Sequence, residues 1–162
     1  MIIFGIDPGS TTTGFGIIKY QNNEFIPLDY GVIQTEPNSS QSVKIKLLIN
    51  DLNELIKTYQ PDSVAIEELF FSKNVKTAIK VAECRGAIIS EMVKFDYDIN
   101  EYTPNQIKQN ICGDGKADKK SVQKMAQIIL NLTAPPKPDD AADALAIAIC
   151  HANHLKQKQY AF

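Results

Sequence analysis

The sequence contains no uninterrupted run of about 18 apolar residues, the length that a membrane-spanning helix needs, so we expect no membrane association. It has no basic N-terminal region leading into an apolar segment, and residues 2–6 are typical of a strand and not of a secretory signal. Its three cysteines, Cys84, Cys112 and Cys150, are widely spaced and form no CxxC pair. This pattern excludes a disulfide framework and a cysteine zinc site, and it predicts reduced, buried thiols in a cytoplasmic protein.

Charge and length set further limits. The net charge of −2 lacks the positive excess typical of nucleic-acid-binding proteins, although metal-bound acids would hide such an excess. A chain of 162 residues has the usual size of one compact domain, here expected to span residues 1–162. His151 and His154 have no cysteine or acid partners at metal-ligand spacing, so they predict an ordinary helix end and not a zinc site.

The apolar pattern predicts five strands, at residues 2–7, 14–20, 25–35, 63–67 and 99–102. It predicts helices at 42–59, 75–95, 104–111 and 121–132, an exposed loop at 112–120, and a last helix from Asp139 or Asp140 to about 156. Short turns make the first three strands antiparallel neighbours, whereas the fourth follows a helix and should be parallel to the first. The expected fold is α/β, with a mixed five-stranded sheet flanked by helices.

Acidic residues end two of the predicted strands, Asp7 the first and Glu67 the fourth. Parallel strands end at the same edge of a sheet, where open α/β sheets bind their ligands, so we expect these two acids to lie together. Side chains alternate along a strand, which puts Glu67 on the face of Ala65 and Glu68 on the other face. Each acid alone also has an ordinary explanation, because Asp before Pro-Gly forms turns and a strand-end Glu often faces water.

A second acid pair, Asp140 and Asp143, opens the nearly apolar segment 140–149. Residues three apart on a helix project from one face. The helix dipole explains an acid in the first turn, but it explains Asp143 less well. No Lys or Arg lies inside the segments that carry the four acids, so a divalent cation is the simplest partner for them. Carboxylate oxygens favour Mg²⁺ or Mn²⁺, and four acids can hold two such ions about 3.5–4 Å apart.

The motifs around these acids resemble those of a known family. Ile6-Asp7-Pro8-Gly9-Ser10, Ala65-Ile66-Glu67 and the segment 140–146 are similar to the three acidic motifs of the RuvC family of crossover junction endodeoxyribonucleases. The similarity extends over essentially the whole chain, including residues 73–74, 82–86 and the region of Lys108. The three motifs together are highly specific, whereas the Asp-Pro-Gly motif alone also resembles a turn of actin-like ATPases.

The resemblance implies a ribonuclease H-like fold, a homodimer and Mg²⁺-dependent resolution of Holliday junctions by paired symmetric nicks. It implies cooperation with the RuvA–RuvB branch-migration complex and a preference for short T-rich sites. The family's catalytic and metal-binding acids fall on Asp7, Glu67, Asp140 and Asp143. Its junction-inserting aromatic residue falls on Phe70, with Phe71 beside it. Its basic residues for junction handling fall on Lys108 and on Lys119 or the adjacent Lys120.

Lysines are the candidates for phosphate contacts. Their ammonium groups would release counterions from DNA, so we expect binding to weaken steeply with salt. Three of them share one face of the predicted helix 75–95 or its lead-in, where they could instead only solvate the helix. The candidates are Lys73, Lys76, Lys80, Lys108, Lys116, Lys119, Lys120 and Lys124. The same helix has apolar positions beyond those that one core contact needs, so we expect it to form the dimer interface.

Three other functions compete with the junction nuclease. An actin-like ATP-binding phosphotransferase would explain the segment 7–11, but such proteins need a second lobe for which this chain is too short. An RNA-processing nuclease of the same superfamily would use the same acids on another substrate. A junction-binding protein without catalysis would not need the four acids.

Overall fold

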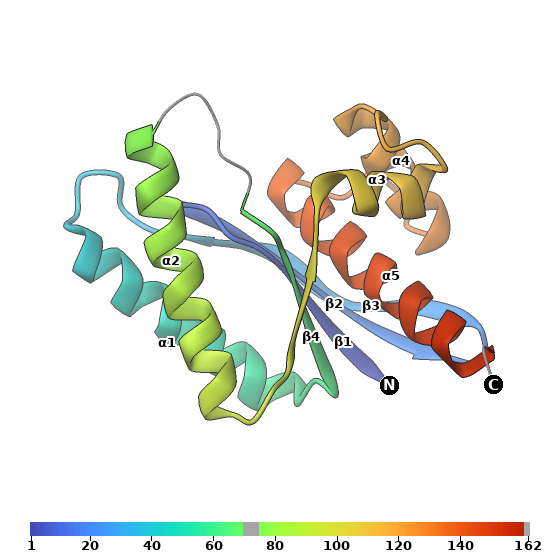
Figure 1. The fold of residues 1–162 in the computed structure, drawn as a ribbon, viewed down its shortest axis with the longest axis horizontal. Coiled ribbons are helices and arrows are strands. Elements are labelled where there is room, and N and C mark those ends of the chain that lie inside the picture. Colours follow the sequence, from blue (N-terminus) through green and yellow to red (C-terminus); the bar gives the residue numbers. More distant parts are fainter. Residues whose placement is uncertain (70–74, 161–162) are drawn as a thin grey trace.

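The computed structural model describes residues 1–69 and 75–160. A five-stranded sheet in the order β3-β2-β1-β4-β5 has helices on both faces (Figure 1). The strands are β1 (Ile2–Asp7), β2 (Thr12–Gln21), β3 (Glu24–Gln34), β4 (Ser63–Glu67) and β5 (Ile99–Tyr102). β1 is antiparallel to β2 and parallel to β4, which confirms the predicted mixed sheet.

The helices form two layers. On one face lie α1 (Gln41–Tyr59) and α2 (Val75–Lys94). On the other lies α5 (Asp139–Tyr160), with α3 (Pro104–Cys112) and α4 (Lys119–Ile129) packed against it (Figure 1). Side chains of β1 alternate between these layers, because Phe4 belongs to the α1–α2 core and Ile3 to the α5 core.

The same alternation places the strand-end acids. Ala65 of β4 packs in the α5 core, whereas Val64 and Ile66 pack against α1 and α2. Glu67 follows Ala65 by two residues and therefore belongs to the face that α5 covers, as predicted. Asp7 follows Ile3 by four residues and belongs to the same face. Both acids end their strands on the side of the sheet that α5 covers.

Glycines let α5 lie directly on β1 and β2. A Cβ at Gly5 would lie 2.3 Å from the main-chain oxygen of Ala144, and a Cβ at Gly14 would lie 2.0 Å from that of Asp140. Gly14 pairs with Asp7 in the register of the two strands. The missing side chain at Gly14 thus brings the first turn of α5 beside Asp7.

The segment 112–120, predicted as an exposed loop, is partly helical. Cys112 is the last residue of α3, which ends where Gly113 adopts a left-handed φ of 74°. α4 begins at Lys119 because the carboxylate of Asp118 caps it, accepting a main-chain N–H at 2.8 Å. Lys119 and Lys120 therefore lie in the first turn of a helix and not in a loop.

Three smaller expectations meet the structure here. All three cysteines are free, but Cys112 is only half-buried. His151 does not end a helix: it is buried within α5, with ring nitrogens 2.7 Å from Ser63 Oγ and 2.8 Å from Tyr102 OH. Within residues 1–69 and 75–160, no helix is both long and apolar enough to traverse a bilayer.

Candidate metal centre

Three carboxylates meet at the carboxyl end of β1. Asp7 ends this strand, and Asp140 and Asp143 project from the first turns of α5. One oxygen from each of the three lies within 4.8 Å of the other two. Acids from segments more than 130 residues apart in sequence thus form one cluster, at a spacing that a shared cation would satisfy.

Glu67 lies outside this group of three but borders the same cavity. The cavity has a volume of about 250 Å³ and reaches from the sheet edge to α3 and α4. Its walls are formed by Asp7, Glu67, Pro104, Ile107, Lys108, Lys119, Val122 and Asp143. The structure therefore brings Asp7, Asp140 and Asp143 within 4.8 Å of one another and places Glu67 in the wall of the cavity that Asp7 and Asp143 also line.

Burial raises the pKa of Asp7 and Glu67. Burial and then the charges of Glu67, Asp143 and Asp140 raise the pKa of Asp7 from 3.8 to about 8. Burial and the charge of Asp143 raise the pKa of Glu67 from 4.5 to about 7. Carboxylates that hold their protons this tightly are short of positive charge, which is the condition that a bound metal ion relieves.

Lys119 supplies part of that missing charge. Its Nζ lies 3.3 Å from Asp143 Oδ2, although the lysine side chain is 69% exposed and that of the acid 24%. The charge of Asp143 raises the pKa of Lys119. Burial raises the pKa of Asp143, and Lys119 opposes this rise. The sequence predicted Lys119 as a DNA contact, whereas in the structure its ammonium pairs with a candidate metal ligand.

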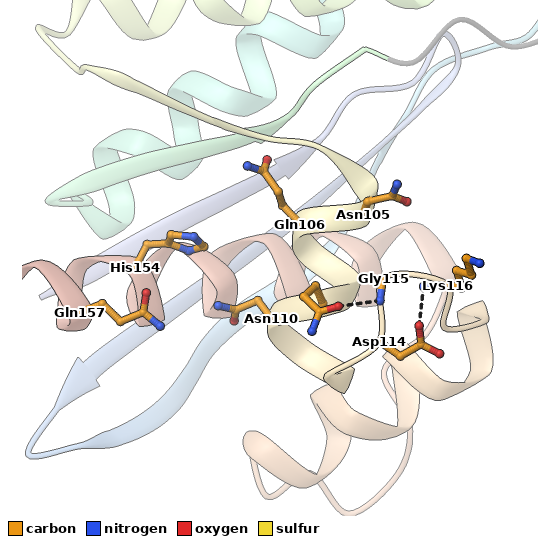
Figure 2. A pocket seen from close by; sticks show the side chains of 9 residues that line it. Asn105, Gln106, Asn110, Asp114, Gly115, Lys116, His154 and Gln157 are labelled. Carbon is orange, nitrogen blue, oxygen red and sulfur yellow. Dashed lines mark hydrogen bonds between the residues drawn. The ribbon is translucent and has the colours of Figure 1, made fainter.

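The loop that delivers Lys119 is held by α3. Gln109 donates from Nε2 to the Gly113 carbonyl at 3.0 Å and accepts the Gly115 N–H at 3.1 Å. The bond from Gly115 borders a second cavity, of about 770 Å³, between α3, the loop and the end of α5 (Figure 2). The walls of that cavity are mostly Asn and Gln side chains and include one acid, Asp114. Although it is larger, its lining lacks the clustered acids that would hold a cation.

The other predicted DNA contacts are dispersed. Lys108 lies at the acid cavity, where its charge lowers the pKa of Glu67. Lys76 and Lys80 are exposed on α2, and Lys120 is exposed on α4. Three predicted residues, Phe70, Phe71 and Lys73, lie outside the described residues.

One residue at the site was not predicted from spacing or periodicity. Arg85 of α2 donates from Nε to the main-chain carbonyl of Glu67 at 3.3 Å. It lies 18 residues from Glu67 in sequence, on another element, so no local pattern connects the two. Only its place in the segment 82–86, which resembles the family, pointed to it.

Comparisons with known proteins agree with this geometry. The family described as crossover junction endodeoxyribonuclease RuvC matches residues 3–151. The RuvC of Ruminiclostridium cellulolyticum is 52% identical, over 94% of this chain and 92% of that protein. The structure of Thermus thermophilus RuvC superposes with a TM-score of 0.90 at 32% identity, covering 98% of this chain and 97% of that one.

A further solved structure carries a ligand. It is described as T. thermophilus RuvC in complex with Holliday junction substrate, and it matches with a TM-score of 0.88 at 30% identity, covering 97% of this chain and 96% of that one. The match of the family extends from β1 into α5 and therefore includes Asp7, Glu67, Asp140 and Asp143. On its sequence, its ribonuclease H-like fold and its acidic site, the chain belongs to the RuvC family of crossover junction endodeoxyribonucleases.

Proposed function

We propose that this protein is a metal-dependent endonuclease that resolves four-way DNA junctions by paired, symmetric hydrolytic nicks. The observation that carries the proposal is the cluster of three Asp carboxylates beside a cavity that Glu67 also lines, in a member of the RuvC family. A related structure of this family holds a Holliday junction substrate. The rival phosphotransferase and RNA-processing functions gain no support from the comparisons.

The donor set of the cavity fits Mg²⁺, with Mn²⁺ as a substitute. All four candidate ligands are hard carboxylate oxygens, and the three Asp oxygens are close enough to share an ion. Asp7 would serve as a ligand to both of two ions, with Glu67 completing the protein ligands of one and Asp140 and Asp143 those of the other. Bound there, such ions would supply a water of lowered pKa and positive charge for the departing 3′ oxygen.

Two lysines complete the electrostatics of the cavity. Lys119 pairs with Asp143, and a cation bound to that carboxylate would release the ammonium. Lys108 borders the cavity from α3. Both ammonium groups can then face the scissile phosphate, where positive charge stabilises the extra negative charge of the transition state. Chain residues would thus provide the ligands for the ions and the positive charge for the phosphate.

DNA recognition requires a wider surface. We assign phosphate contacts to the exposed residues Lys76 and Lys120 and to Lys73, and insertion at the junction centre to Phe70, with Phe71 as a second aromatic. An aromatic side chain stacked on an unpaired base contributes about 1–3 kcal/mol. Phe70→Ala should lower the cleavage rate more than junction affinity, and unchanged turnover would count against the assignment.

Two symmetric nicks need two sites related by a two-fold axis, hence a homodimer. One face of α2 supports this arrangement, because its apolar residues Ile79 and Val93 are 55% and 57% exposed. Gly86 lies between them in sequence, and a Cβ added there would meet no other part of the described structure within 4 Å. These positions recur every seven residues and so share one helix face. Ile79→Glu should yield monomers in sedimentation; a variant that stays dimeric would remove α2 from the interface.

A branch-migration partner of the RuvA–RuvB type follows from the family. Such a partner would move the junction and expose it to the nuclease. Addition of purified RuvA and RuvB should increase cleavage of a long homologous junction but leave that of a short fixed junction unchanged.

A mobile synthetic junction tests the proposed function. The protein should nick it symmetrically with Mg²⁺ and not with EDTA, and it should leave linear duplex and RNA intact. Asp7→Asn should abolish cleavage while junction binding persists, because it removes the shared ligand and not the DNA-binding lysines. Near wild-type cleavage by this variant would refute the two-metal assignment.

A further inference from the structure

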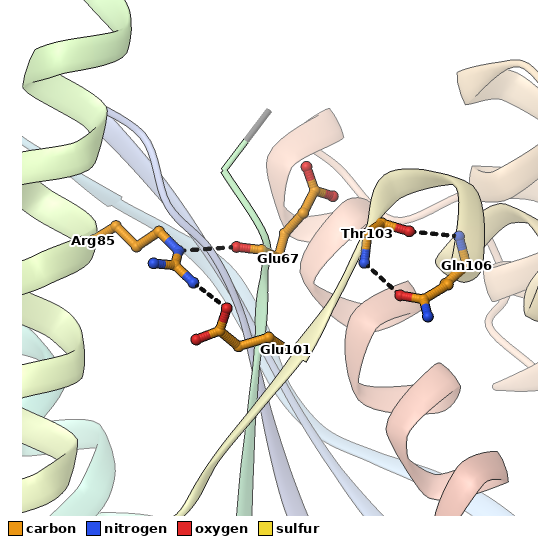
Figure 3. A network of polar contacts seen from close by, with 5 residues as sticks. All are labelled: Glu67, Arg85, Glu101, Thr103 and Gln106. Atoms are coloured by element: carbon orange, nitrogen blue, oxygen red, sulfur yellow. Dashed lines mark hydrogen bonds and ion pairs between the residues drawn. The ribbon is translucent and has the colours of Figure 1, made fainter. Parts of the chain in front are cut away.

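The chain contains a single arginine. All the other Lys and Arg residues, of which the chain has 17 in total, are lysines. The arginine, Arg85, lies at the edge of the nuclease site. The side chain of Arg85 is only 17% exposed. Its Nε donates to the Glu67 carbonyl at 3.3 Å, and its Nη2 donates to Glu101 Oε2 at 2.7 Å (Figure 3). One planar fork thus connects α2 to the ends of β4 and β5.

The arginine binds the main chain of Glu67 and leaves its carboxylate available. Figure 3 shows that carboxylate pointing away from the guanidinium, toward α5. The positive charges that oppose the rise in the pKa of Glu67 are those of Lys119 and Lys108. Arg85 can therefore fix the position of Glu67 without competing with a metal ion for the carboxylate oxygens of Glu67.

A second bond holds the other side of the same peptide unit. The N–H of Glu68 donates to the Tyr102 carbonyl at 2.9 Å. The end of β4 is thus held from α2 on Glu67 and from β5 on Glu68. A cavity of about 180 Å³ lies beside this bridge, with Arg85, Glu67 and Asp7 among its lining residues. The two bonds fix the direction from which the Glu67 side chain enters the acid site.

We infer that Arg85 is a positioning residue of the nuclease: through the Glu67 carbonyl and Glu101 it sets the distance of the Glu67 carboxylate from Asp7 and Asp143. The inference rests on the proposed nuclease function. A lysine could not replace it, because an ammonium is a point charge on a flexible stem, whereas the guanidinium holds two acceptors in a fixed geometry. This requirement accounts for one arginine in a chain that otherwise uses lysine.

The test compares Arg85→Gln and Arg85→Lys with the wild-type protein. Mg²⁺ binding is followed by calorimetry and by the rise in melting temperature, both without DNA. Loss of an outer partner of a metal ligand lowers metal affinity or activity by roughly 10–100-fold. We expect the half-saturating Mg²⁺ concentration to rise and the single-turnover cleavage rate to fall within this range in both variants. The junction Kd, measured in EDTA, should stay within about twofold of wild type.

Lys94→Gln is the matched control. It removes an ion pair of the same helix and the same length, Lys94 Nζ to Glu91 Oε2 at 2.7 Å, without touching the site. Wild-type Mg²⁺ titration in this control supports a local role for Arg85. If Arg85→Gln does not fold, Glu101→Gln serves instead, because it releases the other end of the fork, and a smaller shift of the same sign is expected.

Three results would overturn the inference. The first is an unchanged Mg²⁺ titration in the folded Arg85 or Glu101 variants. The second is full rescue by Arg85→Lys, which would reduce the role of Arg85 to charge. The third is a loss of junction affinity with unchanged Mg²⁺ binding, which would make Arg85 a DNA contact. Absence of cleavage by the wild-type protein would instead refute the nuclease function, while the Mg²⁺ titrations would still decide on Arg85.

Discussion

Asp7→Asn should stabilise the metal-free protein while it destroys the metal site. Burial and three neighbouring acids raise the pKa of Asp7 from 3.8 to about 8. Between these values the unfolded chain carries an ionised Asp7 and the folded chain keeps the proton. The folded state then binds more protons than the unfolded state, so the free energy of unfolding falls as pH rises through this window.

The size of this effect follows from the pKa values. A proton held only by the folded state changes stability by about 1.4 kcal/mol per pH unit, so Asp7 accounts for roughly 4 kcal/mol between pH 4 and pH 7. Asparagine has the shape of the protonated acid and does not titrate. We therefore expect the variant to be more stable by about 2–4 kcal/mol at pH 7 in EDTA, and by less than about 1 kcal/mol at pH 4.

Urea unfolding at both pH values, with EDTA or with Mg²⁺, measures these differences. Mg²⁺ at about 100 times its Kd would add roughly 2.7 kcal/mol to the wild-type protein, and it should add far less to the variant. Asp139→Asn is the control, because this exposed neighbour lies outside the acid cluster, and it should change stability by under about 0.5 kcal/mol. Equal or lower stability of Asp7→Asn at pH 7 in EDTA would refute the reasoning.

Three further changes test other parts of the site. Lys119→Met should lower the half-saturating Mg²⁺ concentration in calorimetry, because no ammonium then competes for Asp143, and yet it should slow cleavage; tighter binding with faster cleavage would contradict the assigned role. Gly14→Ala should cost about 1–3 kcal/mol in urea unfolding, since its Cβ meets the main chain of α5, and a neutral result would mean that α5 is not seated there. Lys108→Gln should reduce the slope of log K against log salt for junction binding by about one, and an unchanged slope would exclude a phosphate contact.

The pairing of the first four strands and the convergence of the acids could be predicted because they follow from local rules. Continuous apolar segments ending in Asp7 and Glu67, joined through a helical crossover, leave few topologies. Ala65 and Glu67 share one face of the sheet because side chains alternate along a strand. The position of Asp143 follows from its helical spacing after Asp140. These are properties of neighbouring residues in the chain, and the structure confirms them.

Contacts between distant elements could not be predicted in this way. Lys119 looked like a loop residue because the capping role of Asp118 was not recognised, and its pairing with Asp143 depends on how α4 packs on α5. The link from Arg85 to Glu67 joins a helix to a strand end and leaves no periodic signal. His151 looked like a helix terminus, although it is buried and bonded to residues of two strands.

The cation cage is tested most directly by anomalous X-ray diffraction from crystals soaked in Mn²⁺. The account predicts anomalous peaks in the cavity between Asp7, Glu67 and the acids of α5, with the ammonium of Lys119 displaced from Asp143. Absence of any peak there at saturating Mn²⁺, with the pair of Lys119 and Asp143 intact, would contradict it.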